Sequence, residues 1–304
     1  MPDRRQFLQA AAAIAGSLAW QPAMALSAAP LLREIGRSGE RLPAVGLGTW
    51  RAFDIEVSGA DGAQASAALQ RLFDEGGRVV DTSPMYGRAE AALGELAQPH
   101  ATRLYLATKI WTQGGAQGRA QFERSLRLLR RERLDLVQVH NLLDTAAHLR
   151  TLREQRERGR VRHIGITHYH AGAHADLMRW MRAEALDFVQ VNYSLAEPEA
   201  AHALLPLAAE RGIAVLVNRP FAEGAMFARV AGREVPAWAR EELGCRSWAQ
   251  CFLKWILAEP AVTCVLCGTR KPAHVADNAG AMFGPLPDAG QRARLAAAWR
   301  DGAR

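Results

Sequence analysis

Lysine is scarce in this chain of 304 residues: Lys109, Lys254 and Lys271 are its only lysines, although the formal net charge is +7. Arginine therefore supplies nearly all of the positive charge, and the basic residues are scattered along the sequence. We expect a solvated basic surface and no nucleic-acid partner. In a chain that otherwise uses arginine, a lysine at the end of a strand suggests a need for its compact, titratable ammonium group.

Long apolar runs and long polar tracts are also missing. The apolar run Ala10–Trp20 is too short to span a bilayer comfortably as a permanent helix, so we expect no stable membrane anchor. Beyond the first thirty residues no tract is polar enough to predict disorder. Because 49% of the residues are hydrophobic, the chain can bury a core large enough for one α/β barrel. We expect a single catalytic domain that acts as a monomer.

The first thirty residues have the order of an export signal. Two adjacent arginines precede Phe7, the apolar residues Ala10–Trp20 follow, and Ala23–Ala25 forms a small-residue cleavage site. Paired arginines before Phe-Leu resemble the bacterial twin-arginine signal, whose translocase exports proteins already folded. An amphipathic helix and a general secretory signal are the alternatives. We predict a signal at residues 1–25, cleavage after Ala25, and a periplasmic barrel domain at residues 26–304.

The four cysteines must be considered in that oxidising compartment. Cys264 and Cys267 have C-x-x-C spacing but lie in a strand-like run, where residues three apart point to opposite faces. Cys245 and Cys251 precede or enter an expected helix. A disulfide between any pair stays open. Zinc is disfavoured because no nearby pair of histidines completes a site, so we expect no metal.

Short β-branched runs alternate with longer segments of helical period from Leu42 onward. This βαβα pattern is typical of a parallel sheet, and eight strands are the number in a (β/α)8 TIM barrel. The expected strands are Val45–Gly48, Val79–Thr82, Leu104–Lys109, Leu134–His140, His163–Thr167, Phe188–Asn192, Ala214–Arg219 and Cys264–Gly268.

Apolar residues at i, i+3 and i+4 mark the helices between these strands. Leu32–Leu42 indicates a hairpin that closes the bottom of the barrel, Phe221–Gly244 a long loop with one short helix, and Pro287–Arg300 a final outer helix. The other expected helices are Ala65–Glu75, Gln121–Arg131, Ala146–Arg158, Ala173–Ala183, Glu197–Arg211, Arg246–Ala258 and Pro272–Met282.

Polar residues follow three of these strands at their carboxyl ends, where the active sites of such barrels lie. Asp81 and Tyr86 follow the second strand, Lys109 ends the third and His140 ends the fourth. Taken alone, each has an ordinary explanation as a turn residue, a packed aromatic, a solvated lysine or a barrel-mouth histidine. Their occurrence in order on successive strands favours one catalytic site.

These segments resemble the aldo-keto reductase family, and the resemblance extends from about Leu42 to Met282. The family pattern Asp-x4-Tyr-Gly fits Asp81 and Tyr86, a Thr-Lys strand ending fits Lys109, and a Leu-x3-His ending fits His140. The resemblance implies reduction of a small carbonyl substrate by a nicotinamide cofactor, with these four residues as the catalytic groups.

The chemistry of the four residues agrees with that implication. Carbonyl reduction requires a hydride donor on one side and a proton donor at the developing alkoxide. A free tyrosine, with a pKa near ~10, is a reluctant acid at neutral pH. The ammonium of Lys109 favours the phenolate of Tyr86, and Asp81 holds that ammonium in place. His140 is expected to orient the carbonyl oxygen and to help relay the proton.

The cofactor site is inferred mainly from the resemblance, because no G-x-G-x-x-G follows a first strand and a Rossmann site is not indicated. Thr167, His168 and Gln190 stand at the family's nicotinamide positions, although His168 replaces the usual asparagine. Asn218 stands where many members place an aromatic ring under the nicotinamide. Stacking on the ring is therefore lost or supplied by Phe221.

The phosphates are expected near the last two loops. Arg219 and Pro220 follow the seventh strand, and Arg219 is a candidate for the pyrophosphate. Arg270 and Lys271 favour the 2'-phosphate of NADP(H), whereas His274 replaces an arginine that serves this phosphate in many members, so NAD(H) stays open. The resemblance implies that the remaining adenosine-phosphate contacts come from Gly268, Thr269, Asp277 and Asn278.

Substrate identity and turnover are less defined by the sequence. An apolar or aromatic carbonyl suits the expected pocket residues Trp50, Met85, Trp111 and Asn141, with Phe221 and Met226 as possible additions. A sugar hydrolase would require paired carboxylates at strand ends, and these are missing. The alternative is a nucleotide-binding or sensory protein on the same barrel with little turnover, since a fold does not fix a function.

Overall fold

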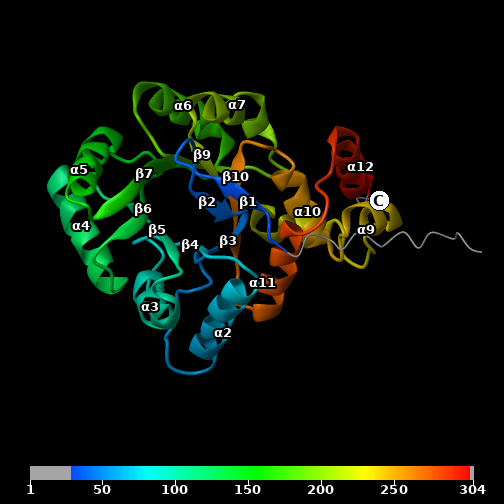
Figure 1. Ribbon diagram of the computed structural model, residues 1–304, viewed down its shortest axis with the longest axis horizontal. Coiled ribbons are helices and arrows are strands. Elements are labelled where there is room, and N and C mark those ends of the chain that lie inside the picture. Colours follow the sequence, from blue (N-terminus) through cyan, green and yellow to red (C-terminus); the bar gives the residue numbers. More distant parts are fainter. Residues whose placement is uncertain (1–28, 302–304) are drawn as a thin grey trace, which may run out of the picture.

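Eight parallel strands close into a barrel in the computed structural model, which describes residues 29–301 (Figure 1). The barrel strands are β3 Val45–Gly48, β4 Val79–Asp81, β5 Tyr105–Ile110, β6 Leu134–His140, β7 Val161–Thr167, β8 Phe188–Asn192, β9 Ala214–Asn218 and β10 Val262–Gly268. They follow chain order around the barrel, and β10 pairs with β3 to close it. The predicted (β/α)8 TIM barrel is confirmed, and the predicted export signal lies outside the described residues.

Helices surround the barrel, as Figure 1 shows. The α-helices are α2 Ala60–Asp74, α3 Ala89–Leu96, α4 Gly115–Leu128, α5 Thr145–Glu157, α6 His174–Ala183, α7 Leu204–Arg211, α8 Ala225–Ala228, α9 Ala237–Leu243, α10 Trp248–Leu257, α11 Pro272–Ala279 and α12 Ala289–Arg300. Short 3-10 helices are η1 Gln98–His100, η2 Ala171–Ala173, η3 Glu199–His202, η4 Ala222–Gly224 and η5 Gly280–Met282.

The helices differ from the sequence predictions in several places, and α2 and α4 begin five and six residues earlier than predicted. Helix α3 was not predicted, and the segment 221–244 forms two short α-helices, α8 and α9, instead of one. The helix predicted at Glu197–Arg211 is interrupted, because Ala203, with φ −146°, lies between η3 and α7. The predicted strand end at Arg219 is also one residue too long, since this residue has a φ of +52° and leaves the extended conformation.

Two separate apolar cores hold the barrel together. The larger one packs the outward-facing strand residues against the helices, and includes Val80, Val137 and Ile166. The smaller one fills the barrel interior and includes Tyr105, Leu136 and Phe188. Alternation of side chains along each strand produces the two sets, because successive residues point to opposite faces.

A hairpin closes the bottom of the barrel, as the sequence predicted. Its strands β1 Leu32–Glu34 and β2 Arg41–Pro43 pair antiparallel. Ile35 and Leu42 are buried in the interior core and cover its amino-terminal end.

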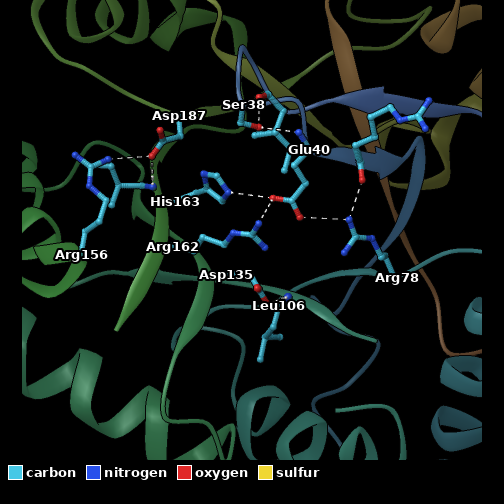
Figure 2. Close-up of polar contacts among 12 residues, drawn as sticks. Ser38, Glu40, Arg78, Leu106, Asp135, Arg156, Arg162, His163 and Asp187 are labelled. Carbon is cyan, nitrogen blue, oxygen red and sulfur yellow. Dashed lines mark hydrogen bonds and ion pairs between the residues drawn. The ribbon is translucent and has the colours of Figure 1, made fainter. Parts of the chain in front are cut away.

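A cluster of charged residues fastens this hairpin to the barrel (Figure 2). Glu40 lies 3.4 Å from Arg78, 2.6 Å from Arg162 and 3.5 Å from His163. Nearby, Asp187 accepts hydrogen bonds from the backbone of Ile164 and from a guanidinium group. The hairpin and these ion pairs occupy the bottom face, so the opposite face, at the carboxyl ends of the strands, is where a site can form.

Two negative findings concern residues 29–301. None of the helices found there is long and apolar enough to cross a membrane. The same part of the chain contains no cluster of three or more His, Cys, Asp or Glu residues that could hold a metal ion.

Candidate active site

A buried ion pair lies at the carboxyl ends of β4 and β5. Asp81 ends β4 and Lys109 is the penultimate residue of β5, and β4 pairs directly with β5. Lys109 Nζ lies 2.5 Å from Asp81 Oδ2 and also donates to the backbone oxygen of Thr82 at 2.8 Å. Burial disfavours the ammonium, but the neighbouring Asp81 carboxylate and Tyr86 outweigh it and raise the pKa of Lys109. Lysine is therefore charged when buried here.

Two glutamines fix the second oxygen of the Asp81 carboxylate. Gln138 Nε2 on β6 and Gln190 Nε2 on β8 both donate to Asp81 Oδ1, at 3.2 and 3.1 Å. All three side chains are buried. Gln138 was not among the predicted site residues, and Gln190 was predicted only as a cofactor contact. Both carboxylate oxygens are thus hydrogen-bonded, which holds Asp81 in one orientation.

Tyr86 lies in the turn that follows β4, between the ammonium and the histidine. Lys109 Nζ is 5.0 Å from the centroid of the Tyr86 ring, and this ring meets the His140 ring edge-on at 5.9 Å. Burial raises the pKa of Tyr86, and Lys109 offsets only part of this effect. Lys109 thus acts on the phenol in the direction that the sequence suggests, but burial has the larger effect on its pKa. The phenol stays protonated at neutral pH, as a proton donor must.

His140 is neutral in this environment. Burial lowers its pKa to about 2, and the positive charge of Lys109 and the ring of His168 act in the same direction. Its Nδ1 atom lies 3.0 Å from the hydroxyl oxygen of Ser83, a fully buried residue two positions after Asp81. Sequence reasoning missed Ser83 because a serine in a Thr-Ser-Pro turn is usually explained by the turn itself.

A buried carboxyl group lies behind the ion pair. Thr108, which precedes Lys109, donates its hydroxyl to Glu90 Oε1 on α3 at 2.7 Å. Burial raises the pKa of Glu90. This contact ties α3 to β5 and holds the backbone that carries Lys109.

The four residues predicted as catalytic are thus brought together, and most residues predicted to contact nicotinamide lie beside them. Thr167, at the end of β7, is buried. Asn218 Nδ2, at the end of β9, donates to the His168 backbone oxygen at 3.1 Å and more weakly to Gln190 Oε1 at 3.4 Å. The buried Asn218 Oδ1 atom has no hydrogen-bond partner within residues 29–301. It can accept one from a bound amide.

The His168 ring is engaged by the residue that follows it. Its centroid lies 5.1 Å from the Tyr169 ring in a stacked arrangement, and its Nδ1 accepts a hydrogen bond from the Tyr169 backbone at 2.9 Å. The Nδ1 atom of the histidine that replaces the family's asparagine therefore already has a hydrogen-bond partner.

Residues after β9 contact one another and the segment that follows β8. Arg219 contacts Glu223 at 2.8 Å and Glu197 at 3.5 Å. Phe221 packs against Phe227, with ring centroids 5.0 Å apart, and Pro220 is buried. To reach a pyrophosphate, Arg219 must leave at least one of its two carboxylate partners.

The segment after β10 fits a nucleotide phosphate. Gly268 ends β10 and pairs with Gly48 of β3. Since neither residue has a side chain, the backbone is uncovered where these two strands end. No side chain caps the first turn of α11, which leaves its backbone N–H groups directed at the segment 268–271. Arg270 is held by Asp61 at 3.0 Å, and the Thr269 hydroxyl accepts a hydrogen bond from the backbone of residue 271.

The predicted adenosine contacts are fixed by a neighbouring helix. Gln250 Nε2 on α10 donates to the Asp277 carboxylate at 2.9 Å, and Asn278 is buried. His274 lies 3.4 Å from the Thr269 hydroxyl. The uncapped first turn of α11, which Arg270 and Lys271 directly precede in the sequence, suits an anionic phosphate.

Large apolar side chains are exposed around the barrel mouth. Trp50, Met85 and Trp111 are 40%, 36% and 40% exposed, and Tyr169 is 47% exposed. Asn141 adopts a φ of +54° after β6, and its side-chain oxygen is buried without a partner in the described part of the chain. Three predicted pocket residues are thus exposed where a substrate could contact them. The fourth, Asn141, has a side-chain oxygen that could accept a hydrogen bond from a bound molecule.

The cysteines take no part in this site. All four thiols are free and buried, and burial raises the pKa of Cys264 and Cys267. The disulfide that the sequence left open is not formed between any pair.

Comparison with known proteins identifies the family. A family model described as "Aldo/keto reductase family" matches residues 44–297. Aldo-keto reductase YhdN of Bacillus subtilis is 24% identical over 287 residues, which cover 79% of this chain and 85% of that protein. Methylglyoxal reductase YeaE of Escherichia coli is 26% identical over 253 residues, with 79% and 86% covered.

Solved structures agree in fold. The crystal structure of an aldo-keto reductase from Klebsiella pneumoniae in complex with NADPH matches with a TM-score of 0.74 at 24% identity, and covers 89% of this chain and 95% of that one. The family match spans most of the chain and includes all four strand-end residues of the site. This chain therefore belongs to the aldo/keto reductase family.

Proposed function

We propose that this protein is an NADP(H)-dependent oxidoreductase that reduces aldehydes or ketones to alcohols. The observation that carries the proposal is the buried Lys109–Asp81 ion pair beside the Tyr86 ring, with His140 edge-on to the same ring. A protonated phenol, a buried cation and a neutral imidazole converge at one place. A carbonyl oxygen that gains negative charge requires such a set of groups.

Each residue has a defined part in that reaction. The cofactor, when bound, supplies the hydride that goes to the carbonyl carbon. Tyr86 gives its phenolic proton to the carbonyl oxygen, and Lys109 stabilises the phenolate left behind. Asp81 holds the ammonium at 2.5 Å, and the neutral His140 orients the carbonyl oxygen before proton transfer. The phenol regains its proton from water after the alcohol leaves.

NADP(H) is favoured over NAD(H) by the residues after β10. Arg270 and Lys271 flank the uncapped first turn of α11, where a 2'-phosphate would find two positive charges. The Klebsiella relative in complex with NADPH supports the same preference. On the nicotinamide side, Asn218 Oδ1 is free to accept a hydrogen bond from the carboxamide, whereas a stacking ring at this position is absent.

The test is NADPH oxidation by the purified barrel domain with a panel of aldehydes and ketones, among them methylglyoxal, which the name of the YeaE relative suggests. Tyr86→Phe should lower kcat by at least about 100-fold, because it removes the proton donor. Tyr105→Phe is the matched control: its buried hydroxyl has no partner within the described residues, so its loss should leave kcat unchanged. Turnover that survives Tyr86→Phe would remove Tyr86 as the donor.

The second candidate is a nucleotide-binding or sensory protein on the same barrel. Two features favour it: Asn218 replaces a stacking aromatic, and the His168 ring is stacked on Tyr169. Tight retention of NADPH without oxidation by any carbonyl on the panel would support this function and contradict the first.

We also propose that the protein acts in the periplasm after export by the twin-arginine translocase. The order of paired arginines, apolar run and Ala23–Ala25 site supports this. Replacement of both arginines by lysine should retain the protein in the cytoplasm. Periplasmic material that begins at Met1 or Pro2 would contradict cleavage after Ala25.

A further inference from the structure

The hydrogen bond between Ser83 and His140 has no part in the mechanism above. Ser83 Oγ lies 3.0 Å from His140 Nδ1, and the two side chains are 0% and 6% exposed. Ser83 belongs to the turn between Asp81 and Tyr86, so the backbone that positions the ion pair and the phenol also positions this hydroxyl group. A contact made inside the site is a candidate for a role in the chemistry.

The partners of the hydroxyl group define the direction of this hydrogen bond. The backbone N–H of Met85 points at Ser83 Oγ from 3.4 Å, and a hydroxyl oxygen accepts this bond through a lone pair. The hydroxyl hydrogen then needs an acceptor of its own. Within residues 29–301, His140 Nδ1 is the acceptor that the structure places within reach.

The two neutral tautomers of His140 are therefore not equivalent. If Nδ1 carried the hydrogen, it would donate to Ser83 Oγ, and the serine hydrogen would be buried without an acceptor. If Nε2 carries the hydrogen, Nδ1 accepts from Ser83, and both the oxygen and the hydrogen of the serine hydroxyl have partners. Because burial and Lys109 keep the ring neutral, the tautomer alone decides which nitrogen can donate.

We propose that Ser83 is a positioning residue that fixes His140 in the tautomer with its hydrogen on Nε2, so that this N–H donates to the carbonyl oxygen of the substrate. The proposal rests on the reductase function proposed above. The segment from Asp81 to Tyr86 then has three roles. Asp81 orients the ammonium, Ser83 orients the imidazole hydrogen, and Tyr86 supplies the proton.

A purely structural role for Ser83 makes a different prediction. The hydroxyl would then serve only to accept the Met85 N–H and stabilise the turn. In that case Ser83→Ala would change stability and leave the ring tautomer unaltered. The two roles are separated by observing the imidazole nitrogens directly.

The experiment combines NMR with kinetics on the whole protein labelled with 15N-histidine. The chain has nine histidines, and His140→Gln identifies the His140 signals by their loss. In the wild type we expect Nε2 protonated and Nδ1 unprotonated. In Ser83→Ala we expect a mixture of both tautomers and a fall in kcat on the order of 10- to 100-fold, with the Kd for NADPH unchanged.

The control variant is Thr151→Val, which removes a different buried hydroxyl, on α5, that bonds to the Ala147 backbone. It should change neither the tautomer nor kcat. A wild-type His140 with its hydrogen on Nδ1, or a Ser83→Ala variant with unaltered tautomer and kcat, would overturn the proposal. The NMR result stands even if no carbonyl is reduced, so failure of the reductase function and failure of the Ser83 role give different results.

Discussion

Replacing Lys109 with methionine should destabilise the barrel and abolish turnover, and a second substitution at Asp81 should separate the two effects. The side chains are 0% and 5% exposed, and their charged atoms are 2.5 Å apart. Without the ammonium, the Asp81 carboxylate stays buried with only the amide donors of Gln138 and Gln190. Removing one partner of a buried ion pair typically costs about 3–5 kcal/mol, and we expect a loss in this range.

The double variant Asp81→Asn with Lys109→Met removes both charges. The new carboxamide can still accept from Gln190, and Gln138 Oε1, which is buried without a partner in the described residues, can accept its N–H. No charge is then left in an apolar site, so we expect the free energy of unfolding to return to within about 1 kcal/mol of the wild type. Stability is thus restored while the ammonium required for catalysis is still missing.

Urea unfolding followed by circular dichroism at pH 7 measures the four proteins of this cycle, and NADPH oxidation measures their turnover. The exposed Lys271→Met serves as the stability control and should shift the free energy of unfolding by less than about 0.5 kcal/mol. Turnover of the double variant should stay at least about 100-fold below the wild type. A double variant that is no more stable than Lys109→Met, or one that regains turnover, would refute the reasoning.

Three further predictions concern stability. His140 should make the wild type sensitive to acid, because its pKa is about 2 in the folded state and near ~6.5 in the unfolded state. Its contribution to the free energy of unfolding is therefore complete above pH ~6.5 and falls by about 1.4 kcal/mol per pH unit below it. Urea unfolding at pH 6.5 and 5 should show a loss about 2 kcal/mol larger in the wild type than in His140→Gln, and equal losses would contradict the neutral buried ring. Lys254→Met should cost about 3 kcal/mol in the same assay because one buried and two partly buried backbone hydrogen bonds are lost, whereas an effect near zero would mean that water replaces the ammonium. Glu40→Gln should cost about 1 kcal/mol and speed hydrogen exchange in the hairpin, since Arg78 and Arg162 lose their anionic partner; unchanged exchange there would show that apolar packing alone holds the hairpin.

Much of the barrel could be predicted from the sequence because its strands are short apolar runs that are buried on both faces. The strand Leu134–His140 was predicted with the bounds that the structure has, and Val45–Gly48 likewise. The catalytic candidates followed, since the carboxyl end of each strand fixes which residues meet at the active face.

The parts of the fold that could not be predicted depend on contacts between segments that are distant in the sequence. Helix α3 has Gly94 in its middle, which weakens its helical signal, yet a Cβ atom at this residue would lie 1.9 Å from the Leu128 backbone oxygen. The glycine is required by packing against α4, which periodicity does not reveal. Likewise Arg270 meets Asp61 across 209 positions of sequence.

The contacts of the site depend on the same kind of proximity. Gln138 and Ser83 became recognisable only when β4 and β6 were placed two strands apart in one barrel, since each meets its partner across 57 positions. Both are ordinary strand and turn residues by sequence. The four catalytic candidates could therefore be predicted from the sequence, but the residues that orient their side chains could not.

The scarcity of lysine now has a structural explanation. An ammonium is compact and has three donors, whereas a guanidinium has five in a planar fork, which is harder to satisfy in a buried site. Lys109 directs two of its donors to Asp81 and to the Thr82 backbone and lies beside Tyr86. Lys254, on α10, is equally buried, and its three donors meet the backbone oxygens of three residues. Two of the three lysines are thus buried at positions where two or three oxygen acceptors suit an ammonium, while arginine forms the partly exposed ion pairs.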